Sequence, residues 1–278
     1  MERLRIPETQ VSGLSLLLGE GEIAVSAKNG SKVTLLETSD ASSWNRRVID
    51  SSYTDGTVPV LGMLGGRVLF ASRRYVPFAV DVDGGRVRHL RSPFLKKAVV
   101  SGRPVELEGE HLIPAYGIPY GCRMVSPVVF SSRDGESFSF RSFVSLSEVF
   151  GMELRHLTLA RLGGELWAVV GSSFPYHLVF VSKSSDGGRS WSTPRLTGIT
   201  GVAPVVLEDG DRLLMACHDV RGDTVKLYES GDGLNWSIVS VCKLGREIRH
   251  LDGQRSGELM LGVTYADGGA ELVLLRGA

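Results

Sequence analysis

The feature that most constrains the fold is a short turn motif that recurs along the chain. It places a serine or threonine two residues before an aspartate, a glycine usually follows, and an aromatic residue closes the motif, as in "SSDGGRSW" (184–191). Short polar side chains bond to nearby backbone N–H groups and glycine accepts positive φ, so each copy predicts a tight turn. The copies pair Asp40 with Trp44, Asp134 with Phe138, Asp186 with Trp191, and Asp232 with Trp236, and a degenerate copy surrounds Asp83.

The spacing of these turns predicts a repeated unit of four strands. Successive aspartates lie 43, 51, 52 and 46 residues apart, which suits four short strands and their turns. A strand-like run such as "LVFV" (178–181) precedes each intact aspartate turn, and a strand, glycine-rich turn and strand such as 157–171 come before it. Long helical periodicity is absent, which excludes the α/β alternatives.

Counting these units gives the expected architecture. Five units carry the turn or its remnant, and residues 247–276 supply three further strands without a fourth. The segment "ERLRI" (2–6) can supply that strand, and pairing the two ends of the chain would leave no open sheet edge. We therefore predict an all-β chain that forms one domain over residues 1–278. It is a six-bladed β-propeller of four-stranded antiparallel blades, closed by the N-terminal strand, which completes the last blade.

Composition narrows the classes of partner. The chain of 278 residues has 31 basic and 31 acidic side chains, so its overall charge favours neither nucleic acid nor membrane. No apolar run reaches the roughly 20 residues of a membrane span, and the first residues lack the apolar stretch of a signal peptide, so a cytoplasmic location is expected. The three cysteines are too widely spaced for a zinc ribbon. No cofactor or metal is implied.

The repeated turn resembles the Asp box of the sialidase (neuraminidase) superfamily, also known from bacterial-neuraminidase-repeat propellers. Residues 184–191 match the pattern in full, and the copies at Asp40, Asp134 and Asp232 are one residue shorter. In that family the boxes lie between the third and fourth strands of a blade, away from the active site. The resemblance therefore implies a structural role for the four aspartates and their aromatic partners.

The catalytic residues of the family are not all matched. The family uses three arginines, a tyrosine nucleophile with a glutamate, and an aspartate acid/base. Arg5-Ile6-Pro7 copies its first arginine motif but falls in the closing strand, and residues 26–32 contain no carboxylate where the aspartate is expected. Residues 246–252 contain no tyrosine, and we interpret the nearby Tyr265 as structural. Sialidase activity of the usual kind is not expected, and an enzyme of this sequence would be a glycoside hydrolase with another acid and nucleophile.

Candidate ligand contacts come from the loops at the central mouth of the propeller. This mouth is formed by the loops that lead into each inner strand and those that join the second strand to the third. Two related segments, "ELRHL" (153–157) and "EIRHL" (247–251), lie at equivalent positions two blades apart, and their arginines could clamp an anion. Three loops also set a proline beside an aromatic residue. The candidates are Arg103, Arg155, His156, Arg249, His250, Tyr116, Tyr120 and Arg123, with Tyr53 and Asp55 from one further loop.

Each of these patterns has a structural alternative. The two arginines could pair with Glu153 and Glu247, and the aromatic loops could simply cover one another. Strand alternation puts Arg155 and Arg249 on one face and the two histidines on the other, so only one pair can face the channel.

Three functions remain at this point. The first is a divergent sialidase-like propeller that binds a small anionic or carbohydrate ligand at the mouth, either with or without hydrolysing it. The second is a non-catalytic scaffold for a protein partner. The third is single-stranded nucleic-acid binding, against which the neutral overall charge argues.

Overall fold

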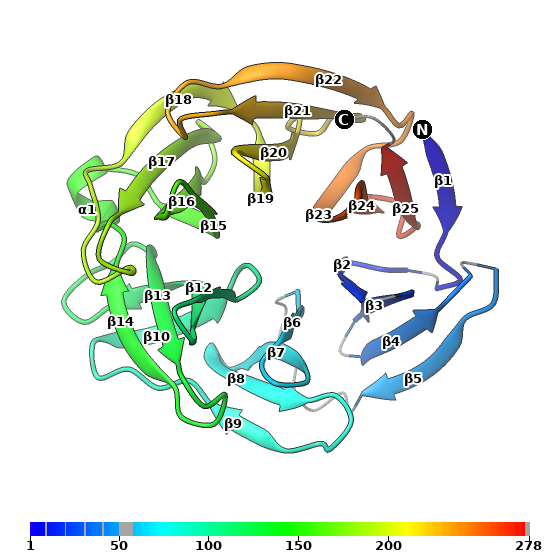
Figure 1. The fold of residues 1–278 in the computed structure, drawn as a ribbon, viewed down its shortest axis with the longest axis horizontal. Coiled ribbons are helices and arrows are strands. Elements are labelled where there is room, and N and C mark those ends of the chain that lie inside the picture. The colour runs from blue at the N-terminus through cyan, green and yellow to red at the C-terminus, as the bar shows by residue number, and fades with distance from the viewer. Residues whose placement is uncertain (9, 20, 31, 41, 50–57, 276–278) are drawn as a thin grey trace.

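A computed structural model describes residues 1–8, 10–19, 21–30, 32–40, 42–49 and 58–275. The described residues form six sheets arranged around a central axis, with the first strand of each sheet nearest the axis and the fourth at the rim (Figure 1). We number these sheets blades 1 to 6. The predicted six-bladed β-propeller of antiparallel blades is confirmed.

The blades follow one another along the chain. Blade 1 is β2 (Gly13–Gly19), β3 (Glu22–Asn29), β4 (Lys32–Thr38) and β5 (Asn45–Ile49); blade 2 is β6 (Val60–Met63), β7 (Arg67–Arg73), β8 (Val76–Asp81) and β9 (Val87–His89); blade 3 is β10 (Leu95–Val100), β11 (Val105–Leu107), β12 (Glu110–Pro119), β13 (Ser126–Ser132) and β14 (Ser139–Phe143). Blade 4 is β15 (Leu154–Leu162), β16 (Glu165–Ser172), β17 (Leu178–Ser184) and β18 (Arg195–Thr200); blade 5 is β19 (Val202–Asp209), β20 (Arg212–His218), β21 (Thr224–Ser230) and β22 (Ser237–Lys243); blade 6 is β23 (Ile248–Ser256), β24 (Glu258–Tyr265), β25 (Ala270–Leu275) and β1 (Glu2–Arg5).

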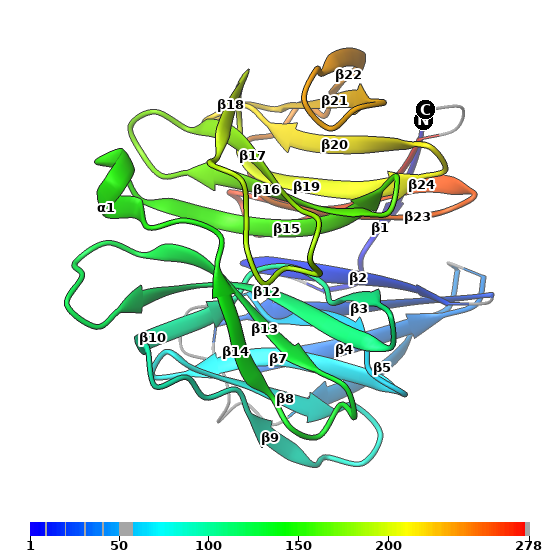
Figure 2. The same ribbon diagram turned by 60° about the vertical axis from the view of Figure 1, so that its left-hand side comes forward.

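The first strand of the chain closes the ring, as the sequence predicts. β1 pairs antiparallel with β25, with Leu4 opposite Leu272, and the Ile6 N–H donates to the Ala270 carbonyl at 3.1 Å. The same apolar side chains pack with Leu14 of blade 1. Blades 1 and 6 are therefore joined by a shared core, and their neighbouring positions are visible in two views (Figures 1 and 2).

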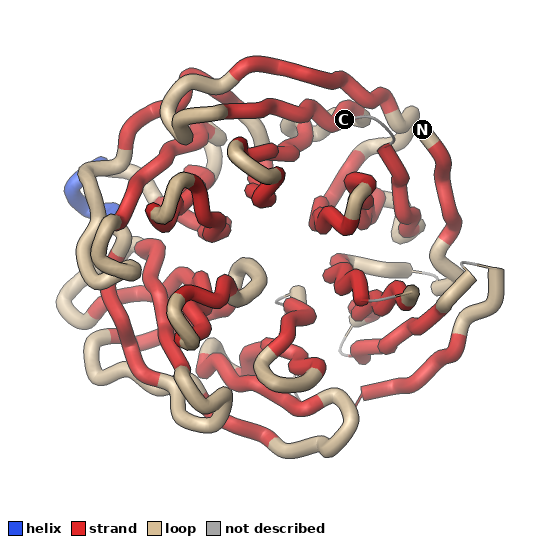
Figure 3. The backbone as a smooth tube through the Cα atoms, viewed as in Figure 1, coloured by secondary structure: helices blue, strands red, loops and turns tan. Residues whose placement is uncertain are grey.

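The core lies between adjacent blades. Strand residues that alternate along the chain face the next blade, so that Trp167 and Val169 of β16 pack against Val206 and Met215 of blade 5. The single helix of the described part, α1 (Ser147–Phe150), is one turn at the rim (Figure 3). No helix in those ranges is long and apolar enough to cross a membrane.

The recurring aspartates hold the turns between third and fourth strands. The Asp186 Oδ1 accepts the Arg189 and Ser190 N–H groups at 3.0 and 2.9 Å and the Ser184 hydroxyl at 2.8 Å. Asp134 accepts two backbone N–H groups in the same way, and these bonds lower the pKa of its carboxyl to about 2. Each such turn thus folds around one ionised carboxylate.

The aromatic residue that ends each turn packs between two blades. The Trp191 Nε1 donates to the Ser142 hydroxyl of blade 3 at 3.0 Å, and its ring joins the apolar cluster between blades 3 and 4. Phe138 and Trp236 occupy the corresponding clusters of their own blades. The turn therefore also fixes how one blade sits against the preceding one.

We expect Asp186→Ala to lower the free energy of unfolding at pH 7 by about 1 kcal/mol, because the backbone N–H groups of the turn lose their acceptor. Hydrogen bonds from the Ser190 hydroxyl and from these N–H groups lower the pKa of Asp186 in the folded state, so this stability is present above the unfolded pKa near 3.8 and is lost as the pH falls below it. Urea titration at pH 7 and pH 3 measures the difference. The exposed Asp211, replaced by alanine, is the matched control, and equal stability of both variants at pH 7 would contradict this role.

Candidate functional site

The inner strands enclose a central channel that contains a cavity of about 360 Å³. This volume lies in the range of small-molecule sites. All six blades contribute to its wall. At the mouth end, where second and third strands are joined, the wall includes Leu14, Tyr116, His156, Ala203 and His250.

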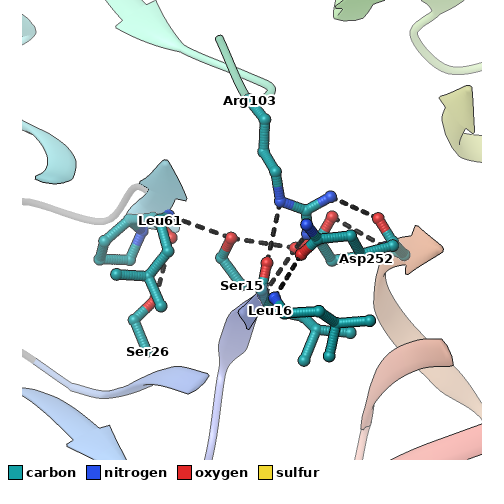
Figure 4. Close-up of polar contacts among 10 residues, drawn as sticks. Ser15, Leu16, Ser26, Leu61, Arg103 and Asp252 are labelled. Carbon is teal, nitrogen blue, oxygen red and sulfur yellow. Dashed lines mark hydrogen bonds and ion pairs between the residues drawn. The ribbon is translucent and has the colours of Figure 1, made fainter. Parts of the chain in front are cut away.

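Arg103 crosses the channel and joins three blades (Figure 4). Its Nε donates to the Leu16 carbonyl of blade 1 at 2.8 Å, its Nη1 donates to the Gly253 carbonyl of blade 6, and its Nη2 lies 2.5 Å from the Asp252 Oδ2. Asp252 also accepts the Ser15 hydroxyl at 2.9 Å and the Leu16 N–H at 2.8 Å. Both charges are therefore neutralised within the channel wall.

The same network extends around the inner strands. The Leu61 N–H donates to the Ser15 hydroxyl at 3.1 Å, and the Leu18 N–H donates to the Gln254 Oε1 at 2.6 Å (Figure 4 shows the first). Arg103 and Gln254 also line a second cavity of about 240 Å³ toward the opposite end. The network thus separates the two cavities.

Arg103 lies deeper than the sequence predicts. The inner strand of blade 3 is interrupted at residues 101–104 and continues as β11, so Arg103 sits within the strand and not in the loop that leads into it. The interruption turns its side chain into the channel, where Asp252 is available. It is consequently paired and does not line an open mouth as a free cation.

The predicted arginines do not converge. The Arg155 Nη2 lies 2.5 Å from the Glu153 Oε2 of its own blade, which is the structural alternative that the sequence left open. Arg249 is exposed to solvent. Arg123 and Tyr120 are also exposed, on the loop between β12 and β13. Tyr53 and Asp55 lie outside the described residues.

The two related segments contribute histidines to the cavity, not arginines. Irregular pairing between Arg155 and Thr158 in β15, and between Ile248 and His250 in β23, marks a bulge in each inner strand. His156 adopts a left-handed backbone with φ of 53° within its bulge. His156 and His250 line the cavity, whereas Arg155 and Arg249 do not.

The histidines at the mouth are held neutral. Burial lowers the pKa of His156 to about 4, and the neighbouring His250, Arg155, His218 and His177 lower it further. Burial likewise lowers the pKa of His218 to about 4 and lowers that of His250. At pH 7 these rings can both donate and accept hydrogen bonds.

His218 is a functional candidate that was named in no motif of the sequence. It is 3% exposed, its Nδ1 lies 2.9 Å from the Asp219 carbonyl, and its Nε2 has no hydrogen-bond partner within the described ranges. The only sequence signal was its place at the end of the second strand of blade 5, where that strand reaches the mouth. A buried ring nitrogen without a partner is unusual in a folded protein.

Tyr116 of blade 3 shares the cavity wall with His156 and His250, and Tyr75 of blade 2 lies near it. Burial raises the pKa of Tyr116, which the nearby Arg155 lowers. The Lys97 Nζ lies 4.4 Å from the centre of the Tyr75 ring. One side of the mouth is therefore aromatic, with a cation held against it.

Carboxylates on the cavity wall are already paired. Among the described residues these are Asp252, bound by Arg103, and Glu208, whose two oxygens accept the Arg161 guanidinium at 2.9 to 3.1 Å. Glycoside hydrolysis uses two carboxyl groups free to act on the substrate. Within the same ranges, no group of three or more His, Cys, Asp and Glu residues is arranged to hold a metal ion.

The two residues that the sequence comparison set against sialidase catalytic residues, Arg5 and Tyr265, lie apart from the cavity. Arg5 is exposed on β1, at the rim. Tyr265 is fully buried, its hydroxyl donates to the Glu271 Oε2 at 3.0 Å, and the Arg246 guanidinium lies 4.0 Å from the centre of its ring. These contacts place Tyr265 in the core between blades 5 and 6.

Comparison with solved structures identifies the fold. A Trypanosoma rangeli sialidase in complex with sialic acid superimposes with a TM-score of 0.67 at 14% identity, over 95% of this chain and 54% of that one. The chain has the sialidase-type propeller fold. A Dyadobacter fermentans protein of unknown function matches this sialidase-type propeller with a TM-score of 0.74 at 14% identity, over 99% and 98% of the two chains.

Other carbohydrate-related propellers share the arrangement. An exo-β-1,3-galactanase of Phanerochaete chrysosporium, solved with galactose, has a TM-score of 0.57 at 9% identity over 96% of this chain and 61% of that one. The sialidase-type propeller spans about half the length of the Trypanosoma enzyme. No family model and no curated protein matches the sequence, so the likeness is one of fold.

We expect Arg103→Met to lower the free energy of unfolding by about 2–3 kcal/mol, because it leaves the largely buried Asp252 carboxylate without its cation. Adding Asp252→Asn to Arg103→Met should restore part of the lost free energy of unfolding, because the unpaired charge is removed. A double-mutant cycle by urea titration measures this coupling. Arg249→Ala, at an exposed position, is the control. Strictly additive losses in the double variant would show that the two side chains act independently.

We expect the stability of the protein to fall as the pH drops from 6.5 to 4. His156 and His218 have folded-state pKa values of about 4, so in this window the unfolded chain binds protons that the folded chain does not. His156→Asn with His218→Gln should flatten the dependence, as measured by melting temperature against pH. Tyr116→Phe, which removes no histidine, should retain it, and an unchanged slope in the histidine variant would refute the assignment.

Proposed function

We propose that this sialidase-type propeller binds a carbohydrate at the mouth end of its channel. The observation that carries the proposal is a cavity of about 360 Å³ whose mouth end is lined by Tyr116, His156 and His250, with both histidines neutral at pH 7. Sugar hydroxyl groups both donate and accept hydrogen bonds, as neutral imidazole and phenol groups do. The sialic acid and galactose bound by fold neighbours support this ligand class.

The charges around the cavity favour a neutral sugar over an acidic one. Arg103 is bound to Asp252 and Arg155 to Glu153, so a ligand carboxylate would compete with a carboxylate of the protein for either arginine. A free arginine fork is what recognises an anion strongly. Binding of an anion therefore costs a broken ion pair, which binding of a neutral sugar does not.

The proposal is one of binding without sialidase chemistry. The carboxylates of the cavity wall, Asp252 and Glu208, are held by arginines, and Tyr265 is buried in the core. We also propose that the turns at Asp40, Asp134, Asp186 and Asp232 are structural Asp boxes, because their carboxylates bond to their own turns at the end opposite the mouth.

Calorimetry measures the affinity of the purified chain for each of five sugars: glucose, galactose, mannose, sialic acid and glucuronic acid. We expect Tyr116→Phe and His156→Asn each to weaken binding of a neutral sugar about 3- to 10-fold, the worth of one hydrogen bond. Asparagine suits position 156 because it accepts the left-handed backbone found there.

Arg195→Ala, at an exposed position of the outer strand β18, is the control for these variants. Sialic acid binding more tightly than every neutral sugar would overturn the preference for an uncharged ligand. Absence of binding by the whole set would overturn carbohydrate binding and favour the protein scaffold.

A further inference from the structure

A further cavity, the rim cavity, lies at the rim of the mouth, on the side of blades 4 and 5. It has a volume of about 230 Å³, and its wall includes Phe174, Tyr176, His177, Thr200, Asp219 and Val220. Phe174 and Tyr176 are 82% and 58% exposed, respectively. The site therefore combines aromatic faces open to solvent with a hydroxyl, an imidazole and a carboxylate, and no element of the channel network uses these aromatic residues.

The exposed aromatic residues of the described chain are all at one end of the propeller. Each lies in a loop that joins the second strand to the third or that leads into an inner strand, and they are Tyr75, Phe94, Tyr120, Phe174 and Tyr176. Exposed aromatic side chains give up the stabilisation that burial would supply. Their confinement to the mouth end indicates a surface that meets a ligand.

The rim cavity adjoins the channel cavity through histidines. His177 lines the rim cavity and lies near His156, which lines the channel. The His218 Nδ1 bonds to the carbonyl of Asp219, another residue of the rim wall. Imidazole groups are therefore found on both the channel wall and the rim wall.

The loop that carries Phe174 and Tyr176 is tied down at its base. The Ser173 N–H donates to the Glu153 carbonyl at 2.9 Å, the Leu178 N–H donates to the Ser172 hydroxyl at 2.8 Å, and the Gly201 N–H donates to the His177 carbonyl at 2.9 Å. A surface fixed in this way loses little conformational entropy when a ligand binds.

The opposite end of the channel is less suited to extend a sugar site. Arg103 crosses it, and ion pairs between neighbouring blades, Arg161 with Glu208 and Arg255 with Asp209, border it. A ligand longer than one sugar would break these pairs there but would meet exposed aromatic side chains at the mouth.

We propose that the rim cavity is a second sugar subsite, so that the ligand is an oligosaccharide with one unit in the channel and the next against Phe174 and Tyr176. This inference rests on the proposed carbohydrate function. The aromatic rings would cover the apolar face of the second sugar, while Thr200 and His177 supply hydrogen-bonding groups for its hydroxyls. Asp219 of the same wall is paired with the Lys226 Nζ at 2.8 Å.

Calorimetry with matched pairs of sugars tests the subsite: galactose with β-1,3-galactobiose, mannose with β-1,2-mannobiose, and sialic acid with the disaccharide sialyl-α-2,3-galactose. We expect at least one disaccharide to bind the wild-type chain about 10-fold or more tightly than its monosaccharide. Phe174→Ala with Tyr176→Ala should abolish this gain and leave the Kd of the monosaccharide within about twofold. Val149→Ala, at an exposed apolar position of the same end, is the control.

The outcomes separate the two proposals. Equal Kd values for each monosaccharide and its disaccharide in the wild-type chain overturn the second subsite and leave carbohydrate binding in place. A double variant that keeps the disaccharide gain also overturns the subsite, provided that its melting temperature matches the wild type. No binding of any of the six sugars overturns both proposals.

Discussion

The pairing of Arg103 with Asp252 governs the centre of this propeller. A charged group in a narrow channel is stable only when its charge and its hydrogen-bonding groups are paired. Here Arg103 also donates to two backbone carbonyls, and Asp252 also accepts a backbone N–H and a serine hydroxyl. One ion pair thereby joins blades 1, 3 and 6. It also removes the free cation and the free carboxylate that an active site of the sialidase kind would require.

The remaining polar groups at the mouth take their character from the bulges in β15 and β23. These bulges change which side of the strand faces the axis, so His156 and His250 enter the cavity while Arg155 pairs with Glu153 at its edge. Burial keeps the histidines neutral. The cavity wall is accordingly polar, and Arg155 and Arg249, which the sequence offered as an anion clamp, do not line it.

Local chemistry explains why the fold could be predicted. Each intact aspartate turn is complete within seven or eight residues, and the carboxylate accepts hydrogen bonds from inside that segment, as at Asp186. The motif can therefore be recognised in the sequence without knowledge of distant contacts. The site could be predicted only in part. Tyr116, His156 and His250 line the cavity, whereas Arg155, Arg249, Arg123 and Tyr120 do not. Asp252 and Ser15 were missed, although an aspartate in the middle of an inner strand signals a cationic partner in the channel.

The sequence by itself determined the repeat, the number of blades and the strand that closes the ring, because turn motifs and strand alternation act over short stretches of chain. Only the tertiary structure decided which charges are free. Arg103 and Asp252 are 149 residues apart in the chain, and their pairing depends on an interruption in β10–β11 and on the closure of the ring. Such pairing follows from the distances between blades, which no local pattern encodes.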